Sequence, residues 1–197
     1  LAPLRKSYTG DVVLGTETST LDASGEVRAT YDMAGVTLDA VAPVLAHFAG
    51  AVHHMGASGS GHVAKLINNF LNAISLAATA EAMVAGRKAG LDLRQLLEVI
   101  NASSGVNFAT LNRFPRIVEG DYLEGGLTSD LMAKDVMLYL DLARELGVTS
   151  LNGPPCLAAF HLAGALGYGD QISNRVVDAL GDIAGGVRVH DQTREAT

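Results

Sequence analysis

The most informative segment of this sequence is Gly59-Ser60-Gly61-His62-Val63-Ala64-Lys65-Leu66-Ile67-Asn68-Asn69, which places a lysine and two asparagines among apolar residues. An unpaired polar group in a core costs about 1–3 kcal/mol, and an unpaired charge costs more. Lys65, Asn69 and Asn72 stand at i, i+4 and i+7, so they share one face of a helix. The segment therefore predicts a long helix with a polar face that can hold a small polar ligand.

Helical patterns dominate the sequence from residue 57 onward. The predicted helices cover 60–89, 92–102, 129–147, 152–167 and 170–184, with a loop-rich stretch over 103–128. Asp92 is the expected N-cap of the second helix, with Gln95 at the capping-box position. The expected fold class is mainly α: an all-helical domain over 57–185 built around the long central helix, followed by a tail over 186–197.

The first 56 residues carry a different pattern. Apolar and polar residues alternate over 27–33, as they would in a half-buried strand. The pattern predicts an amphipathic helix over 37–48 and a short second strand over 51–54. We therefore expect a β-α-β fragment in this part of the chain, whereas residues 1–23 have no pattern that can be assigned.

Composition and charge argue against several classes of function. A net charge of −7 disfavours a nucleic-acid partner, because phosphates would be repelled. The apolar run over 63–84 approaches the ~20 residues that a bilayer requires, but lysine, asparagine and glutamate residues interrupt it, so we expect no membrane span. The single cysteine, Cys156, permits no disulfide framework and favours a reducing cytoplasm. His53 and His54 have no further ligand at zinc spacing, so no metal site is expected.

The glycines before the long helix formally fit a variant of the Rossmann fingerprint, Gly59-x-Gly61-x-x-Ala64. We reject this interpretation because the helix is too long for a βαβ crossover, and Glu81 falls inside the same helix rather than after a second strand. Gly59 and Gly61 instead allow backbone N–H groups at the helix start to approach an anion. A substrate carboxylate would fit there.

Several spaced motifs resemble the β-hydroxyacid dehydrogenases, the family of 3-hydroxyisobutyrate dehydrogenase. The first is a pair of glycines followed by Lys65-Leu-Ile-Asn-Asn69 at the head of a long helix. The others, in the family's order, are Val41-Ala-Pro-Val-Leu45, Ser103-Ser-Gly105, Gly120-Asp121, Leu131-Met-Ala-Lys-Asp135, Pro154-Pro155, Gly167-Tyr-Gly-Asp170 and Ala179-Leu180. The resemblance covers the last three quarters of the chain. It implies an oxidoreductase that uses NAD or NADP, acts on a small 3-hydroxy acid and forms a homodimer or homotetramer.

The resemblance gives roles to three residues. Lys65 matches the catalytic acid/base, which exchanges a proton with the substrate hydroxyl during hydride transfer with the nicotinamide. Asn69 matches the substrate-holding asparagine, and Lys134 matches a lysine close to the bound cofactor. The residues alone leave other interpretations open: Lys65 as a snorkelling lysine at a helix end, and Lys134-Asp135 as part of a solvated helix face. The positive end of the long helix favours a neutral Lys65 that can relay a proton.

The sequence departs from the family at its front. The family has a complete dinucleotide-binding domain, whereas residues 1–56 carry only an incomplete β-α-β remnant of one. Two functions therefore stay open. The first is the substrate-binding and dimerising half of an NAD(P)-dependent dehydrogenase that acts on a small 3-hydroxy acid or its semialdehyde. The second is a catalytically inactive helical module that serves association or small-acid binding.

Overall fold

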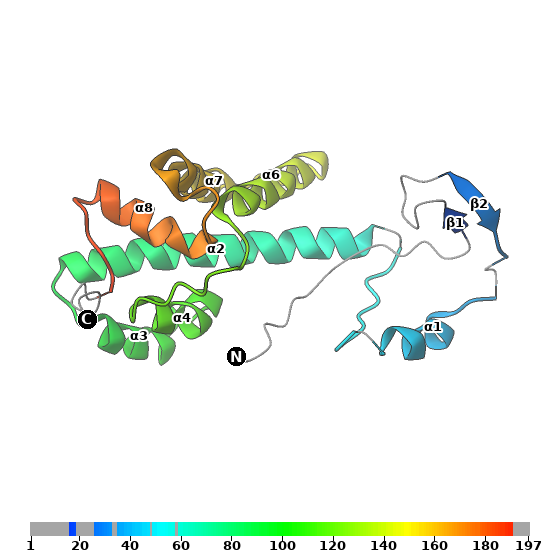
Figure 1. The fold of residues 1–197 in the computed structure, drawn as a ribbon, viewed down its shortest axis with the longest axis horizontal. Coiled ribbons are helices and arrows are strands. Elements are labelled where there is room, and N and C mark those ends of the chain that lie inside the picture. The colour runs from blue at the N-terminus through cyan, green and yellow to red at the C-terminus, as the bar shows by residue number, and fades with distance from the viewer. Residues whose placement is uncertain (1–15, 19–25, 33–34, 48, 58, 191–197) are drawn as a thin grey trace. The chain divides into compact units, whose positions relative to one another are not determined.

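The structure, a computed structural model, describes residues 16–18, 26–32, 35–47, 49–57 and 59–190. It divides into two compact units, residues 1–65 and residues 66–197. Figure 1 shows their elements. One helix, α2, begins in the first unit and continues through the second.

Unit 1 contains a two-stranded antiparallel sheet and one short helix. Strand β1 (Thr16–Thr18) pairs with β2 (Val27–Thr30), with an irregularity in the register between Glu17 and Thr18. Helix α1 covers Leu38–Leu45, within the predicted range, and Thr37 caps it by accepting a hydrogen bond from the backbone N–H of Ala40 at 3.3 Å.

The predicted strand over 51–54 is wrong. Residues 51–55 adopt no regular structure, and every described side chain from 51 to 57 is exposed. The apolar side chains of Val52 and Met55 are among them, so no packed surface in the described part of the chain holds this segment against a neighbouring strand. Strand β2 pairs instead with β1, which lies in the stretch to which no pattern could be assigned. The described residues thus form a hairpin-like pair and a helix rather than a β-α-β unit.

Helix α2, Ser60–Lys88, is the central element of unit 2 (Figure 1). Its fully buried residues, Ala73, Leu76, Ala80 and Met83, recur every three or four positions and so form one apolar stripe. Hydrogen bonds tie α2 to helices that lie far along the chain, for example from Lys88 Nζ to the carbonyl oxygen of Ala184 at 2.9 Å. The prediction of a mainly α fold around a long central helix is confirmed.

The other helical elements of unit 2 are α3 (Leu93–Asn101), α4 (Phe108–Asn112), α5 (Phe114–Ile117), α6 (Ser129–Glu145), α7 (Gly153–Ala163), the π-helical turn η1 (Gly164–Tyr168), the 3₁₀ turn η2 (Ser173–Arg175) and α8 (Val176–Ile183). Asp92 caps α3 as predicted, and Thr128 caps α6, which begins at Ser129, the first residue of the predicted range. In Figure 1, α6, α7 and α8 lie on one side of α2, and α3 and α4 lie on the other.

The predicted loop over 103–128 contains two helices that the sequence analysis missed, α4 and α5. Asn107 starts α4 with a capping box, because its side chain accepts from the backbone N–H of Thr110 at 3.1 Å, and the Thr110 hydroxyl accepts from the N–H of Asn107 at 2.9 Å. These helices are too short for a periodic pattern to reveal them. Ala109 of α4 and Phe114 and Ile117 of α5 are fully buried, so this segment is part of the core.

The core of unit 2 is apolar and closely packed. Phe160 of α7 and Met132 and Val136 of α6 are fully buried. Gly153, the first residue of α7, lies in a tightly packed place: a Cβ atom there would lie 2.5 Å from Cδ2 of Leu140, so that side chain would have to shift. No helix in the described part of the chain is long and apolar enough to span a bilayer.

Candidate functional site

Helix α2 carries the three polar residues that the sequence placed on one face. Lys65, Asn69 and Asn72 are all half-buried, which is unusual for a lysine on a helix that faces water. Lys65 is the last residue of unit 1 and Asn69 belongs to unit 2, but both are on α2, so the geometry of a continuous helix sets their spacing. We call these three residues the α2 polar face.

Asn69 joins α2 to α6 through a buried carboxylate. Its Nδ2 donates a hydrogen bond to Oδ2 of Asp135 at 2.7 Å, and the Asp135 side chain is only 5% exposed. The other carboxylate oxygen, Oδ1, lies 3.0 Å from Nζ of Lys134, whose side chain is 51% exposed. Asp135 thus contacts both Asn69 and Lys134. Because the Asp135 side chain is buried, the interpretation of Lys134-Asp135 as part of a solvated helix face is wrong for Asp135.

An aromatic stack lies beside this hydrogen bond. The rings of Phe70 on α2 and Tyr139 on α6 are parallel within 3°, with centroids 3.8 Å apart. Each of these residues lies within about one helical turn of Asn69 or Asp135, so stack and hydrogen bond form one contact between the two helices. This contact restricts the position of the Asn69 amide relative to Lys134.

Asn72 makes a second long-range contact. Its Oδ1 accepts a hydrogen bond from Nη2 of Arg113 at 2.9 Å, and Nη1 of Arg113 donates to Oδ1 of Asn174 at 2.7 Å. Sequence reasoning missed Asp135 as a partner of Asn69, although it belongs to the quoted Lys-Asp motif. It also missed Arg113 and Asn174, for which no local pattern gives a signal.

Gly59 and Gly61 lie in unit 1, at the start of α2. Gly59 has φ +89°, a conformation that glycine adopts without strain, and its carbonyl oxygen accepts from the N–H of Val63 at 3.1 Å. Gly61 is in the first turn, with no atom within 4 Å of the position that a Cβ would occupy. The anion-binding role of these glycines stays a prediction, as does the role of Lys65.

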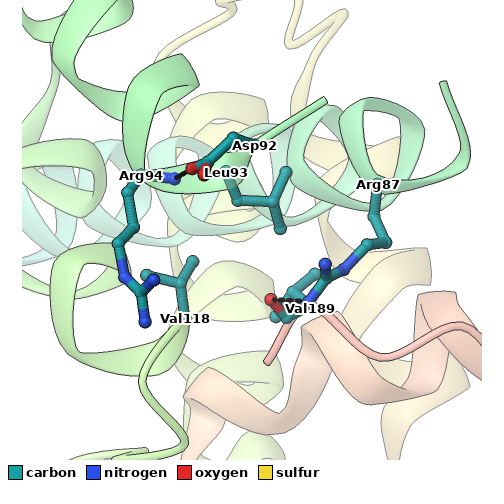
Figure 2. Close-up of a pocket in the computed structure, with 6 residues that line it drawn as sticks. All are labelled: Arg87, Asp92, Leu93, Arg94, Val118 and Val189. Atoms are coloured by element: carbon teal, nitrogen blue, oxygen red, sulfur yellow. Dashed lines mark hydrogen bonds between the residues drawn. The ribbon is translucent and has the colours of Figure 1, made fainter. Parts of the chain in front are cut away.

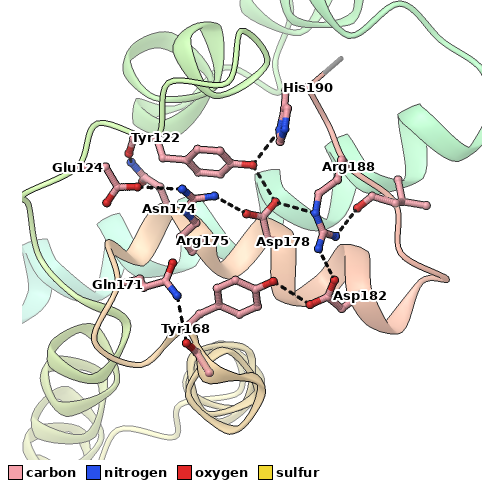
Figure 3. A network of polar contacts seen from close by, with 12 residues as sticks. Tyr122, Glu124, Tyr168, Gln171, Asn174, Arg175, Asp178, Asp182, Arg188 and His190 are labelled. Carbon is pink, nitrogen blue, oxygen red and sulfur yellow. Dashed lines mark hydrogen bonds and ion pairs between the residues drawn. The ribbon is translucent and has the colours of Figure 1, made fainter. Parts of the chain in front are cut away.

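A different polar group of residues lies around α8 (Figure 3), and we call it the Asp178 cluster. Asp178 is buried, and it accepts hydrogen bonds from the Tyr122 hydroxyl at 2.8 Å and from Nη1 of Arg175 at 3.0 Å. Arg188 pairs with Asp182 at 2.6 Å, and Asp182 also accepts from the Tyr168 hydroxyl at 2.9 Å.

The electrostatics of the Asp178 cluster follow from burial and pairing. Burial and the neighbouring charge of Asp178 raise the pKa of Tyr122, so its hydroxyl stays protonated and donates to that carboxylate. Burial pushes the pKa of Asp182 up, but hydrogen bonds from Arg188 and Tyr168 outweigh it, and the pKa lies below its usual value. The charged groups of this cluster are paired with one another, which leaves little capacity for a ligand.

A small cavity lies between α2, α3 and the chain near residue 189 (Figure 2). Its volume is about 60 Å³, and its lining residues are Arg87, Asp92, Leu93, Arg94, Val118 and Val189. Arg87 closes one side by donating from Nη2 to the carbonyl oxygen of Val189 at 3.1 Å. Sites for small molecules measure about 300–1,000 Å³, so this cavity has room for ordered water rather than for a substrate.

Residues 59–180 match the protein family described as NAD-binding of NADP-dependent 3-hydroxyisobutyrate dehydrogenase. Because the match covers more than half of the chain, the chain belongs to this family. L-threonate dehydrogenase of Escherichia coli strain K12 is 30% identical over 162 residues, which are 82% of this chain and 53% of that protein. Mitochondrial 3-hydroxyisobutyrate dehydrogenase of Rattus norvegicus is 36% identical over 135 residues, which are 66% of this chain and 40% of that protein.

A solved structure of Mycobacterium tuberculosis 3-hydroxyisobutyrate dehydrogenase with L-serine has a TM-score of 0.63 to this chain at 29% identity, and the match covers 74% of this chain and 52% of that one. This chain therefore spans about half the length of the relatives that it matches. The family assignment confirms the resemblance inferred from the motifs, and its description as NAD-binding confirms the expected cofactor class, NAD or NADP.

Among the described residues, the Lys134 side chain is of a kind that suits a contact with such a cofactor. An ammonium group has three N–H donors, and Lys134 directs its charge toward Asp135 while half of its side chain remains exposed. Such donors suit the ribose, phosphate or carboxamide oxygens of a dinucleotide. No glycine loop follows a strand at the start of α2, since residues 51–57 form no strand. A cofactor contact through Lys134 therefore stays a prediction, and the described residues that precede α2 do not form a complete dinucleotide site. The described residues also include no group of three potential metal ligands among His, Cys, Asp and Glu.

Proposed function

We propose that this chain provides the substrate-binding side of an NAD(P)-dependent dehydrogenase that acts on a small 3-hydroxy acid or its semialdehyde. The observation that carries the proposal is the link from Asn69 through buried Asp135 to Lys134, which sets a substrate-type amide and a cofactor-type cation on adjoining helices. Family membership supports the reaction class. Relatives named as threonate and 3-hydroxyisobutyrate dehydrogenases support the substrate class.

In the proposed reaction, Lys65 is the acid/base. A bound nicotinamide would supply the hydride acceptor or donor for the substrate carbon. Lys65 takes the hydroxyl proton on Nζ during oxidation and returns it during reduction, which requires a lysine that is neutral before it accepts the proton. Lys65 is half-buried near the start of α2 and shares one helical face with Asn69.

Asn69 holds the substrate in this proposal. One N–H of its amide donates to Asp135, and Oδ1 accepts a long 3.4 Å hydrogen bond from Asn68. Among the described residues these are its side-chain hydrogen bonds, which leaves the second N–H and most of the acceptor capacity of Oδ1 available. An amide with a fixed orientation presents its N–H donor and its oxygen acceptor at set positions. It can therefore distinguish a hydroxyl, which donates and accepts, from a carbonyl oxygen, which only accepts. The N–H groups near Gly59 and Gly61 would receive the substrate carboxylate, and Lys134 would contact the cofactor.

The test is turnover by the purified chain with NAD or NADP and, separately, L-serine, L-threonate and 3-hydroxyisobutyrate. We expect Lys65→Met to lower kcat by about 10²–10⁴-fold, the usual contribution of a general acid/base, with a smaller change in substrate affinity. Lys88→Met, at the other end of α2, is the matched control and should leave kcat unchanged. A Lys65→Met variant with wild-type turnover would contradict the proposal.

Fluorescence titration with NADH and NADPH separates the proposed function from the inactive-module alternative. Binding that Lys134→Gln weakens and Lys88→Met does not would support a cofactor contact through Lys134. A chain that binds neither nucleotide and turns over no hydroxy acid would favour the helical module.

We propose in addition that the chain self-associates as a homodimer or homotetramer and resides in the cytoplasm. Large apolar side chains stay exposed on α2 and α4, namely Ile67, Leu71, Phe108 and Leu111, and contact with another copy would cover them. The buried free thiol of Cys156 suits a reducing compartment. Sedimentation velocity at micromolar concentration tests the first part, and a monomer would contradict it.

A further inference from the structure

Arg113 is a charged side chain whose partners among the described residues are all neutral. It ends α4 and precedes α5, and it is half-buried. Its two recorded acceptors are the amide oxygens of Asn72 and Asn174. The orientation of the Asn174 amide is set independently, because its Nδ2 donates to the carbonyl oxygen of Tyr122 at 2.7 Å. These hydrogen bonds therefore fix the orientation of the guanidinium plane, but the two amides bring no negative charge that would neutralise the cation.

Other arginines of unit 2 are balanced differently. Five of them each pair with a carboxylate: Arg94 with Glu119, Arg116 with Asp121, Arg144 with Asp141, Arg175 with Asp178 and Arg188 with Asp182. Arg113 contacts no carboxylate in the part of the chain that the structure describes. Burial lowers its pKa, which reflects the free-energy cost of holding an unbalanced charge there.

The remaining donors of Arg113 suit an anion. A guanidinium has five N–H groups in a planar fork, and two carry the recorded hydrogen bonds. A carboxylate fits such a fork with two parallel hydrogen bonds, an arrangement that a lysine or an amide cannot reproduce. The Phe108 side chain is 57% exposed, and its ring centroid lies 5.8 Å from Cζ of Arg113, so apolar surface adjoins the cation.

The position of Arg113 connects it to the α2 polar face. Asn72, its partner, is one helical turn beyond Asn69, a rise of about 4.5 Å along α2. The contact with Asn72 therefore places Arg113 against the same face of α2 that carries Asn69. We propose that Arg113 binds the carboxylate of the hydroxy acid while Asn69 engages its hydroxyl. This proposal rests on the proposed function for the substrate, and it prefers Arg113 as the carboxylate site to the N–H groups near Gly59 and Gly61, which keep that role only if the test below contradicts Arg113.

The test is calorimetric titration of the purified chain with 3-hydroxybutyrate and with its uncharged amide, 3-hydroxybutyramide. We expect wild type to prefer the acid, Arg113→Gln to bind the acid at least about tenfold more weakly, as loss of a charge-assisted hydrogen bond implies, and Arg113→Lys to retain part of the affinity. Arg116→Gln, an exposed arginine on α5, is the matched control and should bind as wild type does. Circular dichroism and thermal unfolding establish that each variant is folded.

Each outcome decides the proposal. Wild-type affinity for the acid in folded Arg113→Gln would overturn it, and so would equal binding of acid and amide by wild type. If wild type binds neither compound, the proposed function fails for this chain, and malonate alone becomes the probe. Malonate binding that Arg113→Gln loses would still support a carboxylate site, whereas no malonate binding by wild type would overturn it.

Discussion

The Asp178 cluster and the α2 polar face use similar residue types, but they satisfy them in different ways. In the Asp178 cluster, two buried or half-buried carboxylates meet two arginines and two tyrosine hydroxyls, so opposite charges cancel within the chain. On the α2 polar face, the Asn69 amide donates to the buried Asp135 carboxylate, the Asn72 amide accepts from Arg113, and further donors of Arg113 are left over. A saturated network stabilises the fold, whereas unsatisfied groups on a rigid helix are available to a ligand.

The largest expected effect is on stability in the Asp178 cluster. Asp178→Ala removes the partner of Tyr122 and Arg175 and should lower the free energy of unfolding by about 3–5 kcal/mol, the cost of leaving buried partners uncompensated. Urea unfolding followed by circular dichroism measures it. Asp141→Ala breaks an exposed pair with Arg144 and should cost less than about 1 kcal/mol. Equal losses in the two variants would remove the distinction between the cluster and an ordinary surface pair.

The α2 polar face should show the opposite balance of effects. Asp135→Asn keeps the shape of the side chain but no longer fixes the orientation of the Asn69 amide. A hydrogen bond to a charged group contributes about 1.5–3 kcal/mol, so affinity for the hydroxy acid should fall by about 10–100-fold. Calorimetric titration measures this loss, and urea unfolding should show a smaller change in stability than Asp178→Ala produces.

A double variant separates positioning from structural support at this site. Asn69→Asp combined with Asp135→Asn exchanges the two groups and restores an amide–carboxylate hydrogen bond between α2 and α6. Stability should return toward the wild-type value, whereas affinity for the hydroxy acid should stay low because the group facing the ligand has changed. Recovery of affinity together with stability would mean that Asp135 acts only by holding the two helices together.

Acid should weaken the Asp178 cluster through Asp182. Its pKa is lowered in the folded chain, so its contribution to stability is present above the pKa of an unfolded aspartate, about 3.9, and is lost as the pH falls through the lower folded value. The difference in unfolding free energy between wild type and Asp182→Asn should be constant from pH 7 to about 5 and shrink below about 4. Urea unfolding at each pH measures it, and a difference that grows in acid would contradict the expected sign.

The smallest effect concerns Cys156, which is buried on α7. Burial raises its pKa to about 11, so little thiolate forms at neutral pH and iodoacetamide should react slowly with the folded chain. Denatured chain is the control and should react at the rate of an ordinary thiol. Labelling should accelerate in Asp178→Ala, because opening of the structure exposes the thiol, and it should not in Asp135→Asn.

The local sequence pattern was enough to predict a helix correctly where the residues that are neighbours in sequence are also neighbours in space. The 3.6-residue repeat predicted α2 closely, and Asp92 marked the start of α3. The strand predicted over 51–54 failed for the converse reason, because a strand requires a partner that the segment itself does not supply. The short helices α4 and α5 were missed because one turn or so is too short to show a period.

The sequence by itself determined that this chain is mainly α, that it belongs to the 3-hydroxyisobutyrate dehydrogenase family and that Lys65, Asn69 and Asn72 share one helical face. These conclusions depend on spacing within one element or on motif order. Only the tertiary structure decided that Asn69 meets Asp135, 66 positions away, and that Asn72 meets Arg113, 41 positions away. Contacts between helices depend on how the helices pack, and no local repeat encodes which polar groups are satisfied and which are left free to bind.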